Sequence, residues 1–267
     1  KYAEIALQDK ETNMSSCCGA GGCSTEIYNI MSDDYSSLDG YHADADLGLG
    51  CGLPTQFAKI KKGDVVIDLG SGAGNDCFIA RHETGETGKV IGIDFTPAMI
   101  EKARANAEIR GFHNVEFRQG DIENMPVSAK IADVVVSNCV LNLVPNKDNV
   151  IKDIFRVLKP GGHFSISDVV LVGALPEGLT KDAEMYAGCV SGAIQKTEYL
   201  EFIQKNGQFT INVALIDKGR PLFGIVAAPA TDLLYVGQIG SGVQKRHGSI
   251  WSELDTISSE PSWSNHQ

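Results

Sequence analysis

The ten residues Val65–Gly74, which read VVIDLGSGAG, constrain the fold of this chain more than any other stretch. They begin with a short β-branched run, Val65 to Ile67, which is typical of a strand buried on both faces. Glycines then follow at every second position, and residues 75–82 are suited to a helix. A strand that leads through a glycine loop into a helix presents backbone N–H groups to a ligand. The stretch predicts such a binding loop, with a tight structural turn as the alternative.

The spacing of the glycines indicates the class of ligand. A dinucleotide fingerprint places its third glycine one residue later, where this chain has Asn75, and no lysine follows to make a phosphate-binding P-loop. A second apolar run, VIGID at residues 90–94, ends in Asp94. In a βαβ unit, an acid there can accept hydrogen bonds from both ribose hydroxyls of a nucleoside. The alternative interpretation of Asp94 is a solvated acid at a strand end.

Strands and helices alternate regularly from residue 65 onward. We expect strands at 65–69, 90–94, 115–119, 131–137 and 163–168, and helices at 75–82, 97–110 and 149–158. Thr96 and Pro97 have the residue types of a helix N-cap and first helical position, and residues 159–162 (KPGG) predict a stop and turn. The fold class is therefore α/β, with a doubly wound, mostly parallel sheet. Ligands bind such sheets outside the carboxyl ends of the strands, at the switch in strand order.

The pattern D-x-G-x-G-x-G, from Asp68 to Gly74, resembles the first motif of class I S-adenosylmethionine-dependent methyltransferases. In that family the loop surrounds the amino-acid end of the cofactor, so the resemblance implies S-adenosylmethionine. At the end of the third expected strand, Asp121 could accept from an adenine amino group while Ile122 covers a ring face; a surface turn is the alternative. The predicted cofactor-binding residues are Asp68, Gly70, Ser71, Gly72, Gly74, Asp94, Asp121, Ile122 and Asn138.

Charge and hydropathy limit the partners. Asp and Glu outnumber Lys and Arg by 34 to 23, which gives a net charge of −11. A nucleic-acid surface needs a basic stripe, and the sequence shows none, so we expect no nucleic-acid partner. No run of 18 apolar residues suggests a membrane span, and the first ten residues lack an apolar signal core. We expect a cytoplasmic enzyme that acts on a small or neutral substrate.

We expect four parts along the 267 residues. An amino-terminal, cysteine-bearing segment occupies 1–52, and the cofactor-binding α/β core occupies 53–172. A segment at 173–229 would cover the substrate, and the tail at 230–267 shows no convincing period. This length fits one large domain with a smaller carboxy-terminal appendage.

Seven cysteines are a high number for a chain without a secretion signal, and they favour metal binding or redox chemistry over structural disulfides. Cys17, Cys18 and Cys23 lie in a glycine-rich stretch, but no second CxxC or histidine pair completes a zinc site. That stretch is either a simple loop or a mobile thiol donor. Cys77 follows the glycine loop beside Phe78, and we interpret it as a small core hydrophobe.

Three further cysteines, Cys51, Cys139 and Cys189, lie in glycine-rich or strand-end segments. Cys51 is flanked by two glycines, Cys139 follows the fourth strand, and Cys189 lies in GCVSG. The fold can bring these segments to the rim of the cofactor cleft. Three thiolates without a histidine partner select a soft, thiophilic ion. The alternative is that each cysteine is an inert, buried side chain.

Four segments resemble arsenite methyltransferases: LGLGCGLP (47–54), GAGNDCF (72–78), VSNCVLNLVPNK (136–147) and YAGCVSGA (186–193). The resemblance implies that the thiolates of Cys51, Cys139 and Cys189 bind arsenic(III), whose lone pair attacks the sulfonium methyl in line. It also implies a role in arsenic detoxification and a redox role for Cys17 or Cys18. Arsenite or its thiol conjugates would be the substrate, and thioredoxin or glutathione the reductant. The family's usual carboxy-terminal extension is not recognisable in this chain.

Two rival functions remain open at this point. A methyltransferase of the same fold could act on a carbon, oxygen or nitrogen centre, but it would need a base, for which the chain offers only scattered residues such as His42, His113 and His163. Such an enzyme would be insensitive to thiol blocking. A non-catalytic metalloid sensor would bind arsenite through the cysteines and would not need the cofactor loop.

Overall fold

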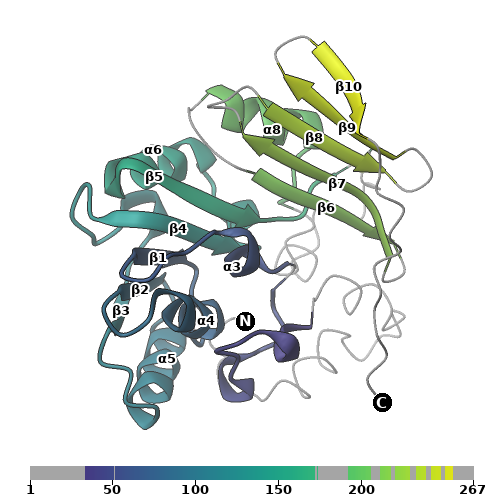
Figure 1. Cartoon of the computed structure of the whole chain (residues 1–267). Helices are drawn as coiled ribbons and strands as arrows, with labels where there is room; N and C mark the ends of the chain where they lie inside the picture. The colour runs from purple at the N-terminus through teal and green to yellow at the C-terminus, as the bar shows by residue number, and fades with distance from the viewer. Residues whose placement is uncertain are drawn as a thin grey trace, which may run out of the picture.

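The computed structural model contains a five-stranded parallel sheet followed by a five-stranded antiparallel sheet (Figure 1). The structure describes residues 34–50, 52–171, 173 and 192–205, together with strands at 211–217, 220–228, 233–238, 242–247 and 250–254. In the first sheet the strand order is β3-β2-β1-β4-β5, and every neighbouring pair is parallel. The predicted doubly wound α/β fold is thereby confirmed.

The parallel strands are β1 (Val65–Leu69), β2 (Lys89–Asp94), β3 (Val115–Gln119), β4 (Ala132–Asn138) and β5 (Leu158–Ser167). The helices are α3 (Pro54–Phe57), α4 (Asn75–Thr84), α5 (Pro97–Ile109), α6 (Lys147–Val157) and α8 (Lys196–Lys205). Short 3₁₀ turns lie at η1 (Tyr35–Ser37), η2 (Ala43–Ala45), η3 (Ile122–Asn124) and η4 (Leu141–Leu143). The first four predicted strands and the second helix agree with these bounds to within one residue.

The alternation of side chains along β1 creates two apolar cores, one on each face of the sheet. Ile67 and Leu69 point into a core that α6 completes, with Tyr199 of α8 also buried there. Val66 points to the opposite face, where it packs with buried residues of α4 and α5. Because side chains alternate across a strand, Asp68 faces the same side as Val66. The carboxylate of β1 is thus directed toward the helix that follows the glycine loop.

The prediction of a stop and turn at residues 159–162 is wrong, because these residues belong to strand β5. Helix α6 ends at Val157, and β5 begins at the next residue, five residues before the predicted start. Along β4 the pairing advances from Ala132 to Val134, whereas along β5 it advances from Leu158 to His163. The proline and glycines therefore form an irregularity within β5, because extra residues can bulge from a strand without ending its pairing.

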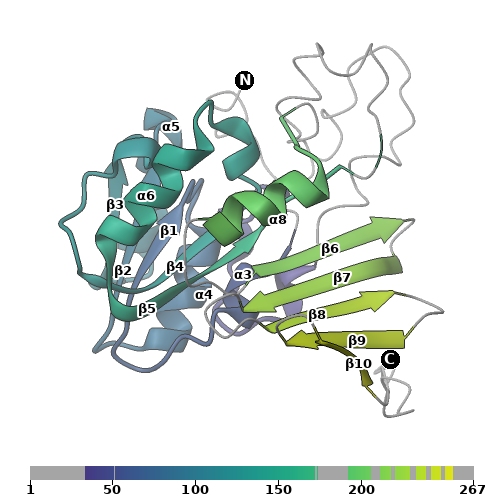
Figure 2. The ribbon, with the colours of Figure 1, turned by 90° about the horizontal axis from the view of Figure 1, so that it is seen from above.

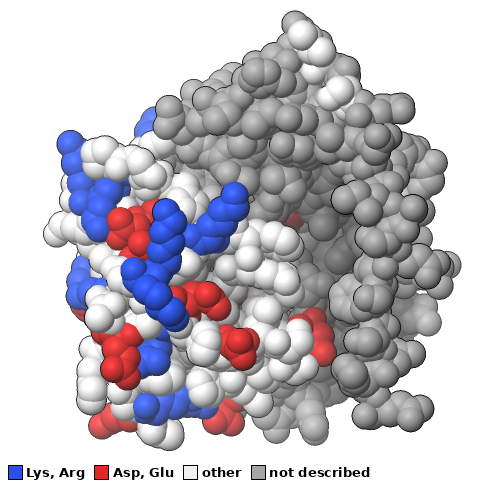
Figure 3. Space-filling model, in the orientation of Figure 1, with Lys and Arg blue, Asp and Glu red and all other residues white. Residues whose placement is uncertain are grey.

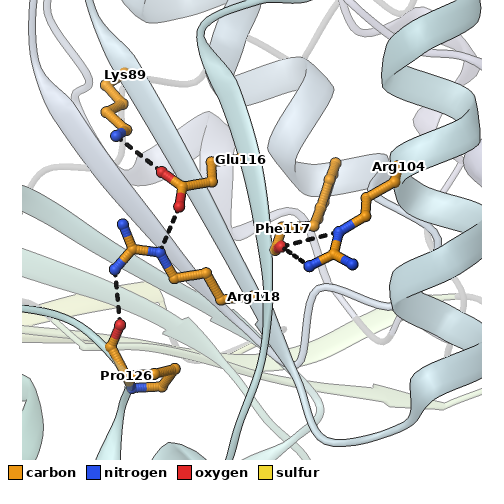
Figure 4. A network of polar contacts seen from close by, with 6 residues as sticks. All are labelled: Lys89, Arg104, Glu116, Phe117, Arg118 and Pro126. Carbon is orange, nitrogen blue, oxygen red and sulfur yellow. Dashed lines mark hydrogen bonds and ion pairs between the residues drawn. The ribbon is translucent and has the colours of Figure 1, made fainter.

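Side chains cover the free edge of β3, the outermost strand of the parallel sheet (Figure 4). The Arg104 guanidinium of α5 donates two hydrogen bonds, of 3.2 and 2.7 Å, to the carbonyl oxygen of Phe117. Glu116 pairs with both Lys89 and Arg118 at 2.8 and 2.7 Å. The hydrogen bonds from Arg118 and Lys89 lower the pKa of Glu116 to about 2. Charged side chains along an edge strand discourage pairing with another chain.

The antiparallel sheet has the order β10-β9-β8-β7-β6, and it extends beyond β5 and α8 (Figure 2). Its strands are β6 (Ile211–Asp217), β7 (Arg220–Ala228), β8 (Leu233–Gln238), β9 (Gly242–His247) and β10 (Ile250–Leu254). The last three strands lie in the region 230–267, where the sequence showed no convincing period. Short strands joined by short connections give a weak periodic signal, so this meander was missed.

Two surface properties concern possible partners. On the face shown in Figure 3, basic and acidic side chains are interspersed over the part that the structure describes. Among the described residues, no helix has both the length and the apolar character that a membrane span requires.

Candidate functional site

The site lies at the carboxyl ends of β1 and β4, where the strand order switches. The glycine loop leaves β1 and is held by backbone hydrogen bonds: the amides of Gly70 and Ser71 both donate to the carbonyl of Ile93, at 2.8 and 3.0 Å. The amide of Gly74 donates to the carbonyl of Ser71 at 2.9 Å. The loop therefore has a defined shape that β2 supports.

The three glycines of the loop serve different purposes. A Cβ at Gly70 would lie 2.3 Å from Cγ2 of Val140, and one at Gly74 would lie 2.9 Å from the Phe117 ring. Both positions need glycine for close packing. A Cβ at Gly72 would meet none of the described residues within 4 Å, although its φ of +51° also favours glycine. Gly72 is therefore the glycine of the three that faces open space, where a ligand can approach the backbone.

Asp94, the predicted ribose-binding acid, also anchors this loop. Its two carboxylate oxygens accept hydrogen bonds from the amide of Gly72, at 3.0 Å, and from the amide of Thr96, at 2.8 Å. Burial raises the pKa of Asp94, and these two hydrogen bonds oppose the shift. A carboxylate offers about four acceptor positions, so Asp94 can bind the loop and still accept from a ligand. Thr96 occupies the predicted N-cap position of α5, but its side chain does not cap that helix.

The site contains an excess of buried negative charge. Asp68 is 2% exposed and accepts from the Cys77 thiol at 3.2 Å, while Asp76, on the first turn of α4, is 8% exposed. Burial raises the pKa of Asp68, and the neighbouring carboxylates of Asp76 and Asp94 raise it further. Burial also raises the pKa of Asp76, to about 6, against hydrogen bonds from Asn138 and Tyr35. A cationic ligand would relieve this repulsion.

Polar atoms without a partner mark the same place. The side-chain oxygens Ser71 Oγ, Asn75 Oδ1 and Asp76 Oδ1 are buried and make no hydrogen bond to the described residues. Buried polar groups are normally satisfied, so these atoms at the start of α4 suit a ligand that carries donors. A sulfonium cofactor with an amino-acid end provides both positive charge and N–H donors. The residues present therefore fit S-adenosylmethionine.

At the end of β3, the structure shows Asp121 and Ile122 in contacts within the protein. Asp121 is exposed, and its Oδ1 accepts from the amide of Glu123 at 2.9 Å, so it caps η3. Ile122 is 6% exposed and packs into the apolar core on the α6 side. The adenine contacts predicted for these two residues stay predictions.

Asn138 ends β4 and Cys139 directly follows it, beside the glycines that flank residue 51. A Cβ at Gly50 would lie 2.8 Å from the side-chain nitrogen of Asn138, and one at Gly52 would lie 2.7 Å from the Ser167 side chain. The amide of Cys139 donates to the carbonyl of the same Ser167 at 2.8 Å. The two glycines therefore allow the chain on either side of residue 51 to approach the ends of β4 and β5.

Cys139 has an unusual backbone for a non-glycine residue. Its φ is +54°, in the left-handed region, and the side chain is 6% exposed. Such conformations cost about 1–3 kcal/mol and concentrate at functional sites. Its sulfur is disulfide-bonded. Cys77 is buried in the core with α4 and α5, as predicted.

Several predicted site residues fall outside the described residues, namely Cys17, Cys18, Cys51 and Cys189. The same holds for Cys23. Within the described ranges, no group of three potential ligands could hold a metal ion. The three-thiolate site consequently stays a prediction, with Cys139 as its one described member.

Sequence reasoning missed two residues that belong to the site. Tyr35 lies before the first predicted strand, where no pattern distinguishes it, yet its hydroxyl donates to the carbonyl of Gly52 at 2.7 Å. Asp76 lies within the segment GAGNDCF, and its position in the first turn of a helix after the glycine loop was the available signal.

Asp168, directly after β5, is the centre of a second buried network, and sequence reasoning gave it no role. It accepts from Asn142 at 2.9 Å, from the hydroxyl of Tyr199 at 3.1 Å and from the amide of Val169 at 3.2 Å. Burial raises its pKa from 3.8 to about 7, against those hydrogen bonds and the charge of Lys147. A carboxyl group whose folded pKa is raised stabilises the fold at low pH, and this contribution is lost as the pH rises through the folded pKa.

We therefore expect Asp168→Asn to gain stability over the parent as the pH rises from about 4 to 8. The gain should amount to about 2–4 kcal/mol across that range, and urea unfolding at several pH values measures it. Asp133→Asn is the control, because hydrogen bonds from Lys159 and the Val65 amide lower the pKa of Asp133 despite its partial burial. The difference in free energy of unfolding between Asp133→Asn and the parent should not change between pH 5 and 8. If the difference between Asp168→Asn and the parent is also independent of pH, the prediction is wrong.

A family model described as a methyltransferase domain matches residues 60–207, more than half of the chain. The chain belongs to this methyltransferase family. The match spans the glycine loop, Asp94 and Cys139, whereas Tyr35 and the glycines beside residue 51 precede it. The model of the inositol monophosphatase family matches residues 200–265, which is too small a share to show membership.

Similar proteins carry the name arsenite methyltransferase. The one from Halobacterium salinarum is 42% identical over 235 residues, covering 82% of this chain and 58% of the relative. The one from Aquipseudomonas alcaligenes is 33% identical over 214 residues, covering 77% of this chain and 59% of the relative. The chain thus spans somewhat more than half the length of the curated relatives that it matches. These relatives confirm the predicted resemblance.

A solved structure of an arsenic methyltransferase is also similar to this chain. CrArsM, an arsenic(III) S-adenosylmethionine methyltransferase from Chlamydomonas reinhardtii, aligns with a TM-score of 0.53 and 36% identity. The alignment covers 59% of this chain and 55% of that one. The prediction that S-adenosylmethionine is the cofactor is confirmed by the family and by this neighbour.

Proposed function

We propose that this methyltransferase transfers a methyl group from S-adenosylmethionine to trivalent arsenic held by the thiolates of Cys51, Cys139 and Cys189. The observation that carries the proposal is the position of Cys139. It follows β4 directly, at the switch in strand order, and the chain on either side of residue 51 packs against the same strand end. Arsenite methyltransferases among the similar proteins add support.

In this proposal, one set of residues binds the cofactor and another set, the three thiolates, binds arsenic. Asp94 would hold the nucleoside end of the cofactor, and the loop at Gly72 would lie against its amino-acid end. The buried carboxylates of Asp68 and Asp76 would offset its positive charge. When bound, S-adenosylmethionine supplies an electrophilic sulfonium methyl, which is the group that the arsenic lone pair attacks in line. The thiolates keep that lone pair directed at the cleft and exclude hydroxide from arsenic. Holding two reactants at near-attack distance removes about 7–11 kcal/mol from a barrier.

A lone-pair nucleophile needs no general base, and this agrees with the residues around Cys139. Among the described residues, the side chains at the end of β4 are those of Asn138, Ser167, Tyr35 and Asp76, and the Asp76 carboxylate oxygen that faces this group already accepts from Tyr35 and Asn138. A methyltransferase acting on an oxygen or nitrogen centre would need a base to remove a proton. The local chemistry supports arsenic as the substrate over those centres.

Thiol redox chemistry completes the proposed cycle. The disulfide of Cys139 must be reduced by two electrons before its sulfur can bind arsenic. After methyl transfer arsenic is pentavalent, and two thiols return it to the trivalent state by forming a disulfide; we assign one of these two thiols to Cys17 or Cys18. Thioredoxin or glutathione would reduce that disulfide. Both act in the cytoplasm, where we expect this arsenic detoxification to occur.

One assay tests the proposal directly. The full chain is incubated with methyl-labelled S-adenosylmethionine, arsenite and a thiol reductant, and the products are separated by chromatography. We expect labelled methylarsenicals, and none after the thiols are blocked. Label transfer that survives thiol blocking would favour a methyltransferase of another substrate class. Arsenite binding without cofactor binding, measured by calorimetry, would favour a metalloid sensor.

A further inference from the structure

Four polar groups from distant parts of the chain converge beside Cys139. The hydroxyl of Tyr35 donates to the carbonyl of Gly52 at 2.7 Å and lies 3.3 Å from Oδ2 of Asp76. The side-chain nitrogen of Asn138 donates to the same Gly52 carbonyl at 2.9 Å and to the same Asp76 oxygen at 3.1 Å. Asn138 also donates to the Tyr35 hydroxyl. Tyr35 is 4% exposed and Asp76 is 8% exposed.

The protons of this cluster are shared among its acceptors. Tyr35 supplies one proton and the Asn138 amide supplies two, so three of the five close contacts can be hydrogen bonds at one time, with the Gly52 carbonyl, the Asp76 carboxylate and the Tyr35 oxygen as acceptors. Burial raises the pKa of Tyr35, and the charge of Asp76 raises it further, so the hydroxyl keeps its proton. An ionised carboxylate only accepts, and it therefore fixes the direction of the surrounding donors.

The cluster joins the three segments that the proposed reaction must bring together. Asp76 belongs to the helix after the glycine loop, Asn138 directly precedes Cys139, and Gly52 directly follows residue 51. Gly50 packs against the same Asn138 nitrogen and the same Tyr35 hydroxyl, at 2.8 and 2.9 Å from where a Cβ would be. The spacing between the chain at residue 51 and the end of β4 is consequently set by these hydrogen bonds.

We propose that Tyr35 and Asp76 are positioning residues, which hold the chain on either side of Cys51 against the end of β4 so that the thiols of Cys51 and Cys139 can share one arsenic atom. This inference rests on the proposed function. Neither residue needs to touch arsenic or the cofactor in this role. Their effect acts through the backbone at Gly52 and the side chain of Asn138.

The test compares Tyr35→Phe with the parent in the reduced full chain. We expect the KM for arsenite to rise about tenfold, because the Gly52 carbonyl loses a buried donor. The kcat at saturating arsenite and the calorimetric Kd for S-adenosylmethionine should stay within about twofold of the parental values. The reason is that the proposed positioning role affects the binding of arsenite and not that of the cofactor. Retention of arsenite after gel filtration, measured by elemental mass spectrometry, should fall in parallel without any methyl transfer.

Tyr41→Phe is the matched control, because the Tyr41 hydroxyl donates to Asp46 at 3.0 Å, outside the cluster. Its KM for arsenite should match that of the parent. Asp76→Asn, which keeps the shape of the side chain, provides a second variant if Tyr35→Phe folds poorly. It should raise the same KM when S-adenosylmethionine is saturating, although its cofactor Kd should rise as well, because Asp76 also offsets the charge of the cofactor. The double variant should add little to the KM for arsenite, because the two residues act through one cluster.

The possible outcomes separate the two claims. A parent that methylates arsenite, together with variants whose arsenite KM is unchanged, would overturn the positioning role and leave the proposed function intact. Equal losses in Tyr35→Phe and Tyr41→Phe, or a loss confined to cofactor binding, would overturn the positioning role as well. A parent that neither retains nor methylates arsenite would overturn both claims.

Discussion

Cys139→Ser is expected to lower kcat/KM for arsenite methylation by at least about 100-fold while leaving cofactor affinity within about twofold. Serine keeps the Cβ, so the variant retains the left-handed backbone of residue 139 with its φ of +54° and removes only the sulfur. A hydroxyl is a hard, weakly acidic ligand that does not replace a thiolate on a soft metalloid. Methyl transfer is followed with arsenite, labelled cofactor and excess reductant, and cofactor affinity is measured by calorimetry.

Cys77→Ser serves as the matched control for this variant. Cys77 is fully buried between the sheet and α4, and a serine hydroxyl there can still donate to Asp68 as the thiol does. We expect its methylation rate to stay within about threefold of the parent, because it lies in the apolar core and not at the strand end. If Cys139→Ser methylates arsenite at the parental rate, the proposal that the Cys139 thiolate binds the arsenic substrate is wrong.

The sequence predicted those parts of the site that depend on local pattern. Val65–Ile67 and the glycines made β1 and its loop recognisable, because a buried parallel strand and a binding turn each have a short, local signature. Asp94 was found in the same way, from its place at the end of a second apolar run. The strand order that brings β4 beside β1 follows from the βα alternation, and this placed Cys139 at the cleft.

Other parts of the site depend on contacts between residues far apart in the chain, which no local pattern reveals. Tyr35 reaches Gly52 and Asp76 across 17 and 41 residues, and Asn138 reaches Tyr35 across 103. The role of Asp168 likewise arises only when β5, η4 and α8 meet. The sequence shows that two glycines flank Cys51, but not what lies against them. The structure shows that they permit close contact with Asn138 and Ser167.

Asp94→Ala is expected to weaken S-adenosylmethionine binding by about 100-fold or more. In the parent, this carboxylate joins the Gly72 amide of the loop to the Thr96 amide of α5, and we propose that its remaining acceptor positions bind the ribose hydroxyls. Hydrogen bonds to a charged group contribute about 1.5–3 kcal/mol each, so losing two of them to the ribose accounts for the expected factor. The loop would also lose its anchor, and the three glycines would become free to sample other conformations.

The measurement is a calorimetric titration of the reduced full chain with S-adenosylmethionine, and Asp64→Ala is the matched control. Asp64 lies just before β1, at the opposite end of the strand, where it accepts from the Lys61 amide at 2.8 Å. Removing it also costs one turn hydrogen bond, so any general loss of stability should be shared by both variants. We expect its cofactor Kd to stay within about twofold of the parent. Equal weakening in the two variants would mean that Asp94 supports the fold without binding the ribose. An unchanged Kd in Asp94→Ala would place the cofactor elsewhere on the sheet.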